Sequence, residues 1–176
     1  MTGPVAVPPV QLSRDAGVTD QEIFGQLYPA LRRFAAVVGA VEMDPDDLVQ
    51  DAVARALAGG SLSRFDSPGA YLRQAIVNAA SNDRRRAGRR RRALTRFGGG
   101  LTEAQPSAYP SDIAQLARFS PSVRALIYLR VIDGLAYDEI ASMLGVSASS
   151  ARMKLSRALR SIRSSGLDIP SAKDHT

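Results

Sequence analysis

The residues best suited to a specific chemical role lie near the C-terminal end, on one side of an expected helix at residues 148–163. At about 100° per residue, apolar side chains share one stripe of this helix. The opposite side carries Ser149, Ser150, Met153, Lys154, Arg157 and Arg160, with Arg152 nearer the flank. No Asp or Glu lies between Ser147 and Arg163, whereas a solvated helix usually mixes both signs. Because arginine and lysine can bind guanine edges and phosphates, the pattern predicts a helix that reads nucleic acid.

A shorter helix precedes this one and ends in a glycine turn. Residues 136–144 carry an inward apolar stripe, Gly145 suits a left-handed C-cap, and Ser147 suits the N-cap of the following helix. Two helices joined in this way form a helix-turn-helix motif, whose second helix enters the major groove. A plain helical hairpin with a solvated basic face is the alternative interpretation.

Positive charge is concentrated in a second place, at residues 84–96. Eight arginines stand there with no acid between them, and without them the net charge of +6 would become −2. The planar fork of arginine suits phosphate. A solvated basic tail and a GC-rich genome are the alternative explanations for so many arginines.

Residue types that are absent or rare exclude several classes of protein. The chain has no cysteine and a single histidine, His175, which excludes disulfides, thiolate metal sites and histidine-based triads. We therefore expect no catalytic residue, no metal site and no cofactor, and an enzyme such as a nuclease is the weakest interpretation. No apolar run approaches the ~20 residues of a membrane span, and no secretory signal is evident. We expect a cytoplasmic protein without membrane insertion.

The elements that must position these side chains are helices throughout. Residues 19–22 form a capping box, with Val18 and Ile23 placed as a hydrophobic staple, and Pro29 predicts a kink or a split in the first helix. Asp44-Pro45 and Ser67-Pro68 begin the second and third helices. The expected apolar stripe of the second helix comprises Leu48, Val49, Ala52, Val53, Ala56 and Leu57.

The fold class that follows is all-α, with two small helical domains joined by a flexible linker. The first domain spans residues 19–96 and the second 111–165, where Ser120-Pro121 begins the central helix. Residues 97–110, which contain three consecutive glycines and two prolines, are the linker. Residues 1–18 are expected to be a disordered tail and residues 166–176 a C-terminal tail.

Three segments resemble conserved regions of bacterial RNA polymerase sigma factors, and most of all the extracytoplasmic-function (ECF) group of the sigma-70 family. They read DPDDLVQDAV at 44–53, AYLRQAIVNAASNDRRR at 70–86 and GLAYDEIASMLGVSASSARMKLSRA at 134–158. The resemblance covers about residues 24–163 and implies a sigma region 2 bundle followed by a sigma region 4 helix-turn-helix. Both halves occur in the family's order.

The resemblance also implies roles for individual positions. Core polymerase would bind the second helix at Asp46, Asp47, Leu48, Gln50 and Asp51. The minus-10 element would contact Phe65, Tyr71, Arg73, Asn78, Asn82, Arg85 and Arg86. The minus-35 element would contact Ser149, Ser150, Arg152, Met153, Lys154, Ser156 and Arg157.

The function implied is that of an alternative sigma factor, which binds core RNA polymerase, recognises the minus-10 and minus-35 promoter elements and promotes transcription initiation. Many relatives are held inactive by an anti-sigma factor, which makes such a factor a further candidate partner beside core polymerase and promoter DNA. The alternative is a helix-turn-helix regulator of the response-regulator type, which needs a receiver or ligand domain before the linker. A third class is a polybasic RNA-binding or membrane-surface protein built around residues 84–96. Salt-sensitive binding without promoter specificity would identify a protein of this class.

Overall fold

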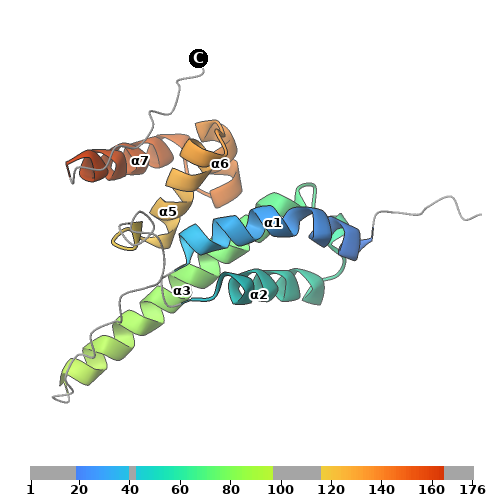
Figure 1. The fold of residues 1–176 in the computed structure, drawn as a ribbon, viewed down its shortest axis with the longest axis horizontal. Helices are drawn as coiled ribbons and strands as arrows, with labels where there is room; N and C mark the ends of the chain where they lie inside the picture. The colour runs from blue at the N-terminus through green and yellow to red at the C-terminus, as the bar shows by residue number, and fades with distance from the viewer. Residues whose placement is uncertain (1–18, 40–42, 97–115, 165–176) are drawn as a thin grey trace, which may run out of the picture.

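The computed structural model describes residues 19–39, 43–96 and 116–164, and within these ranges the chain is helical, without a strand (Figure 1). The first unit contains α1 (Asp20–Val38), α2 (Pro45–Ala58), the short 3₁₀ turn η1 (Leu62–Arg64) and α3 (Pro68–Arg96). The second contains α5 (Pro121–Ile127), the π-helical turn η2 (Tyr128–Ile132), α6 (Tyr137–Leu144) and α7 (Ala148–Arg163). The all-α fold class is confirmed. The predicted linker and both tails lie outside the described residues.

The helix starts follow the local signals in the sequence. Thr19 caps α1 in a complete capping box, in which the Thr19 amide donates to Glu22 Oε2 at 2.8 Å and the Glu22 amide to Thr19 Oγ1 at 3.2 Å. Asp44 caps α2 by accepting from the Asp46 amide at 2.8 Å. Val18, one half of the predicted staple, lies outside the described residues. Pro29 lies exposed inside a continuous α1, so of the two predicted outcomes, a kink or a split, the split does not occur.

Packing of the first unit depends on one apolar stripe from each helix. Leu48, Val49 and Ala52 of α2 are buried, as predicted, against α1 and α3. Leu57, which was predicted to share their stripe, is 42% exposed. At 100° per residue it lies more than 100° around the helix from the centre of the buried positions, so it faces solvent. α3 continues through the arginine-rich stretch as one helix and ends at Arg96.

The second unit forms the expected helix-turn-helix. Gly145 ends α6 with φ of 63°, a left-handed conformation that costs glycine little, and the Ser150 amide donates to Ser147 Oγ at 3.2 Å at the start of α7. The sequence did not predict the π-helical turn after α5, where the Asp133 amide reaches the Tyr128 carbonyl at 3.1 Å.

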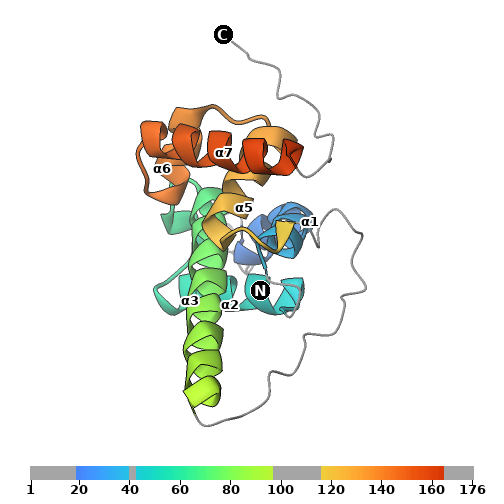
Figure 2. The same ribbon diagram turned by 90° about the vertical axis from the view of Figure 1, so that its left-hand side faces the viewer.

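The two units share one core, which the sequence also did not predict. α5 lies between α7 on one side and α1 and α3 on the other, as the stacking of these helices in Figure 2 shows. Every side chain from Arg124 to Leu129 is therefore buried. A helix that is buried on all sides lies in the middle of a fold rather than at its surface. None of the described helices is long and apolar enough to cross a membrane.

Candidate nucleic-acid and polymerase interfaces

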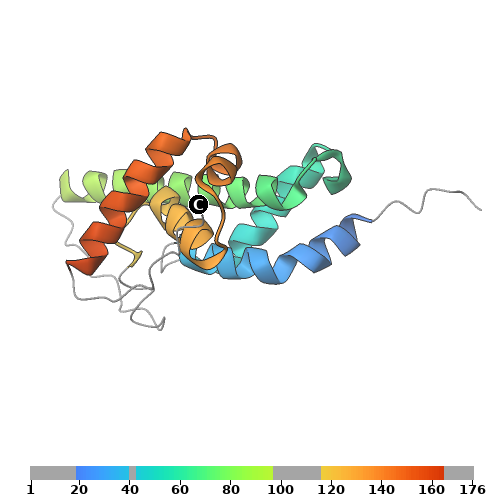
Figure 3. The same cartoon turned by 90° about the horizontal axis from the view of Figure 1, so that it is seen from above.

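The outer side of α7 presents the side chains that the sequence placed there. Ala151, Leu155 and Ala158 turn inward. We call the opposite side the reading face of α7, and its exposed residues are Ser149, Arg152, Met153, Lys154, Ser156 and Arg157. Ser150, also predicted to bind DNA, is only partly exposed. α7 lies across the end of the molecule with this side uncovered by the other described helices (Figure 3).

One tyrosine that the sequence analysis missed helps to position this face. The guanidinium carbon of Arg152 lies 5.0 Å from the ring centre of Tyr137 at the start of α6. Arg130 approaches the same ring at 5.1 Å, and its Nη1 donates to the Leu135 carbonyl at 3.0 Å. Cation–π contacts of this kind favour Arg over Lys because the planar group stacks on the ring. Tyr137 therefore holds Arg152 at the edge of the reading face.

A stripe of α3 brings together most of the residues predicted for the minus-10 element. At 100° per residue, Tyr71, Asn78, Asn82 and Arg85 lie within about 40° of one line along the helix. Asn78, Asn82 and Arg85 are exposed, and Arg85 Nε donates to the Ser81 carbonyl at 3.3 Å. Side-chain amides can form hydrogen bonds with the edges of unpaired bases. We call these four residues the amide face of α3.

An aromatic pair lies at the N-terminal end of the amide face. The rings of Phe65 and Tyr71 are stacked, with centres 3.9 Å apart and planes inclined by 23°. The turn that carries Phe65 is tied to the first helix, since Asp20 accepts hydrogen bonds from the Ser61 hydroxyl at 2.6 Å and the Leu62 amide at 2.7 Å. Stacked aromatic rings are suited to bind unpaired bases. The role of Asp20 as an anchor was not visible in the sequence, where it only favours the helix start.

Arg73 is not on the amide face, although the family resemblance grouped it with the minus-10 residues. It lies about 160° around α3 from Tyr71, and its Nη2 contacts Asp133 of the second unit at 3.4 Å. Its Nε is buried and has no hydrogen-bond partner among the described atoms. Arg86, also predicted to contact the minus-10 element, is exposed and lines a cavity of about 140 Å³ between α2 and α3 together with Asp47 and Asn82.

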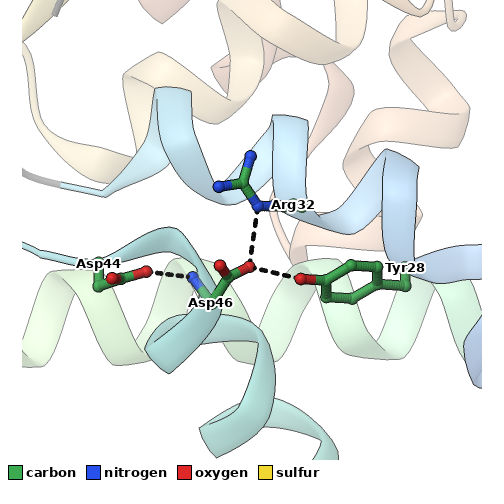
Figure 4. A network of polar contacts seen from close by, with 4 residues as sticks. All are labelled: Tyr28, Arg32, Asp44 and Asp46. Carbon is green, nitrogen blue, oxygen red and sulfur yellow. Dashed lines mark hydrogen bonds and ion pairs between the residues drawn. The ribbon is translucent and has the colours of Figure 1, made fainter.

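The acidic start of α2 divides into residues that hold the fold and residues that face solvent. Asp46 Oδ1 accepts from the Tyr28 hydroxyl at 2.7 Å and from Arg32 Nε at 3.0 Å, which ties α2 to α1 (Figure 4). The hydrogen bond to Asp46 raises the pKa of Tyr28, so the phenol stays protonated. Leu48 is only 2% exposed and belongs to the core.

Asp47 and Gln50 point to solvent, and Asp51 is half-buried in an ion pair of 2.8 Å with Arg55. We call Asp47, Gln50 and Asp51 the acidic face of α2. Of the five positions predicted to bind polymerase, these three remain available. Among the residues described, no group of three or more His, Cys, Asp or Glu side chains lies together as a metal site would require.

Comparison with known families agrees with this arrangement of faces. Residues 23–90 match the family described as sigma-70 region 2, and residues 113–162 match sigma-70 region 4. These regions define promoter-recognition subunits of RNA polymerase, which bind core enzyme and promoter DNA. The chain belongs to the sigma-70 family, as the two matches together span about two thirds of its length.

A solved structure shares the fold. It is the co-crystal structure of the sigma factor RpoE in complex with the anti-sigma factor NepR from Bartonella quintana, with 24% sequence identity and a TM-score of 0.63. The match covers 82% of this chain and 94% of that one. No curated protein sequence matches the chain significantly. The prediction of a sigma factor is confirmed, and the response-regulator alternative is not supported, because region 2 occupies the place where a receiver domain would stand.

Proposed function

We propose that the chain is an alternative sigma factor of the ECF group whose three exposed faces divide the work of initiation. The observation that carries this is the order of the faces along one chain. An acidic face on α2 and an amide face on α3 lie in region 2, and an acid-free reading face lies on α7 in region 4. The protein supplies no catalytic group, since polymerase performs the chemistry, and it acts where polymerase does, in the cytoplasm.

The acidic face of α2 is the proposed docking site for core polymerase. Asp47 and Gln50 are free to contact a basic partner surface, whereas Asp46 keeps α2 fixed against α1 through Tyr28 and Arg32. A docking helix that is held by its neighbours loses less entropy on binding than a mobile one. Leu48 has no place in this interface, because it is buried in the core.

The amide face of α3 is the proposed site for the minus-10 element. Asn78 and Asn82 would contact base edges of the opened strand, while the Phe65–Tyr71 pair offers ring faces at one end. Arg85 and Arg86 would neutralise phosphates. Asn82 and Asp47 line the same cavity, which supports a minus-10 site beside the acidic face, so DNA and polymerase would meet between α2 and α3.

The reading face of α7 is the proposed site for the minus-35 duplex. Arg157 lies in the middle of the helix, opposite the buried Leu155 and the partly buried Leu159, where its guanidinium can reach a guanine edge. Arg152 and Lys154 lie closer to the flanks and would hold phosphates.

An anti-sigma factor is a proposed third partner. The similar structure of RpoE was determined in complex with the anti-sigma factor NepR. A partner that covers the acidic face or the amide face would prevent initiation without changing the fold.

Run-off transcription with core polymerase over a library of promoters tests the proposed function. We expect transcripts from a subset of promoters that share one minus-35 and one minus-10 sequence. A chain that binds the same promoters but yields no transcript with core polymerase would be a regulator rather than a sigma factor.

A further inference from the structure

One side chain of the reading face of α7 is large and apolar, although its neighbours there are polar or charged. Met153 is 50% exposed, whereas Ser149 and Arg157, on the same side of the helix, carry a hydroxyl and a guanidinium group. The other large hydrophobic side chains that are exposed among the described residues all lie outside α7. A single exposed apolar residue is ordinary on a protein surface, so the position of Met153 on its helix decides what it means.

Met153 occupies the side of α7 that faces directly away from the core. The buried stripe of this helix consists of Ala151, Leu155, Ala158 and Ile162. At 100° per residue, Met153 lies about 170° around the helix from the centre of that stripe, and Arg157 lies about 130° from it. A recognition helix in the major groove turns this side towards the base pairs. Met153 is therefore placed to meet base edges, and not to extend the core.

The surroundings of Met153 give its side chain room to project. Ser149 lies about one turn earlier and Ser156 about one turn later, and both are exposed. Their short side chains allow the helix backbone to approach a groove closely, while the long, unbranched methionine extends beyond them and adapts its shape. The adjacent cation, Arg152, is held at the edge of the reading face, with its guanidinium carbon 5.0 Å from the ring centre of Tyr137.

The chemistry of the major groove identifies what an apolar side chain at this place can recognise. Base edges there present hydrogen-bond donors and acceptors, and thymine alone adds an apolar group, its C5 methyl. The thioether of Met153 has no hydrogen to donate and accepts only weakly. A polar base edge packed against it would lose water without gaining a partner. Contact with a methyl group instead removes apolar surface of both partners from water, which is favourable.

We propose that Met153 is a specificity-determining residue for the minus-35 element, which selects a C5-methylated pyrimidine by packing against its methyl group. The inference rests on the proposed function, since it requires α7 to read the minus-35 duplex. Arg157 follows four residues later, about 6 Å along the helix at 1.5 Å per residue. At 3.4 Å per base pair, the selected pyrimidine therefore lies within about two base pairs of the guanine assigned to Arg157.

The test removes single methyl groups from the promoter. It uses the full chain assembled with core polymerase and a promoter identified by run-off transcription. Each thymine of the minus-35 element, in either strand, is replaced in turn by deoxyuracil, which pairs in the same way and lacks only the methyl group. At one of these thymines the wild-type holoenzyme should lose roughly three- to fivefold in affinity, as expected for one methyl group removed from water.

Variants of Met153 assign this loss to the side chain. Met153→Ser and Met153→Ala should bind the thymine and deoxyuracil promoters equally well, because nothing apolar is left to meet the methyl group. Met153→Leu, which keeps a large apolar side chain, should retain most of the discrimination. Ile132→Ala is the matched control, since it truncates a hydrophobic side chain of the same unit that is 67% exposed and lies outside α7. It should discriminate as the wild type does.

A second pair of promoters separates the methyl group from the other features of thymine. A C·G pair in place of the selected T·A pair presents an amino group instead of a carbonyl on the pyrimidine. Methylation of that cytosine at C5 restores the methyl group alone. The wild type should bind the methylated promoter roughly three- to fivefold more tightly than the unmethylated one, and Met153→Ser should bind both alike.

The inference is overturned if the wild type binds thymine and deoxyuracil equally at every position, or if the preference persists in Met153→Ser. Loss of holoenzyme assembly in Met153→Ser would also overturn it, because the residue would then contact polymerase. These failures leave the proposed function standing as long as the wild type transcribes from promoters that share one minus-35 sequence. A wild type without promoter-dependent transcripts would refute the proposed function and the inference with it.

Discussion

At the scale of single residues, the structure separates side chains that read or bind from side chains that hold others in place. Arg157 and Arg152 both lie on the reading face of α7, but only Arg152 contacts an aromatic ring of its own unit. Asp46 and Asp47 are adjacent in sequence, yet Asp46 is tied to Tyr28 and Arg32 while Asp47 faces solvent. Neighbouring residues of the same type therefore differ in whether they hold the fold together or remain available to bind a partner.

Replacing Arg157 by alanine should relax preference at one base pair of the minus-35 element. A bidentate contact to guanine discriminates by about 1–3 kcal/mol, and its loss removes that preference while leaving other positions alone. Lys154→Ala, the matched control, should weaken binding to all sequences alike and lower the salt slope by about one. Affinities for a panel of singly substituted promoters measure both effects. Uniform weakening by Arg157→Ala would identify that residue as a phosphate anchor.

At the scale of the element, α2 and α3 each pack against the core with one side and present the other side to a proposed partner. The core side was readable from sequence because apolar residues recur at helical spacing, and the caps Thr19 and Asp44 were readable because they act over three residues or fewer. What the sequence did not reveal depends on contacts between distant segments. Examples are the tie from Asp20 to the turn before Phe65 and the position of Arg73 opposite Asp133.

Placing positive charge on the acidic face of α2 should abolish binding to core polymerase. Asp47→Lys with Gln50→Lys changes two exposed side chains, so the helical content should stay as in wild type. Opposite charges at a protein interface govern association and specificity, and like charges there are costly. Co-purification with core polymerase is the measurement, and Asp138→Lys in region 4 is the control. Retention of binding by the double variant would move the polymerase site elsewhere.

Removing the two amides of α3 should impair promoter opening without affecting polymerase binding. Asn78→Ala with Asn82→Ala deletes hydrogen-bonding groups that are exposed in the free protein, so the stability of the fold should change little. Permanganate reactivity of thymines in the promoter bubble should fall, while the complex with core polymerase still forms. An unchanged bubble would show that these amides are ordinary surface residues.

At the scale of the whole molecule, the two units behave as one body because they share a core. Helix caps and periodicity predicted the helices of each unit, but apolar periodicity cannot tell which of two possible neighbours covers a helix. α5 illustrates this, since the run from Arg124 to Leu129 is buried on all sides only because α1 and α3 cover the side that α6 and α7 leave open.

Phe34→Ala should therefore destabilise both units together. Loss of a fully buried phenylalanine costs about 3–5 kcal/mol, and Phe34 contacts Tyr128 of the second unit as well as its own core. Chemical denaturation followed by hydrogen exchange at Leu72 and Leu155 should show both amides losing protection. Leu57→Ala, at a site that is 42% exposed, should change stability by less than about 0.5 kcal/mol. If only Leu72 lost protection, the units would fold independently.

The Phe34–Tyr128 contact also has a consequence for synthesis of the chain on the ribosome. About 90 residues separate the two rings, and translation adds about 5–20 residues per second. For roughly 5–20 seconds, Phe34 has left the peptidyl transferase centre while Tyr128 does not yet exist. During that interval the first unit lacks the Tyr128 ring that packs edge-on against Phe34 in the finished protein. Newborn chains consequently pass through a state in which the core that the two units share is still incomplete.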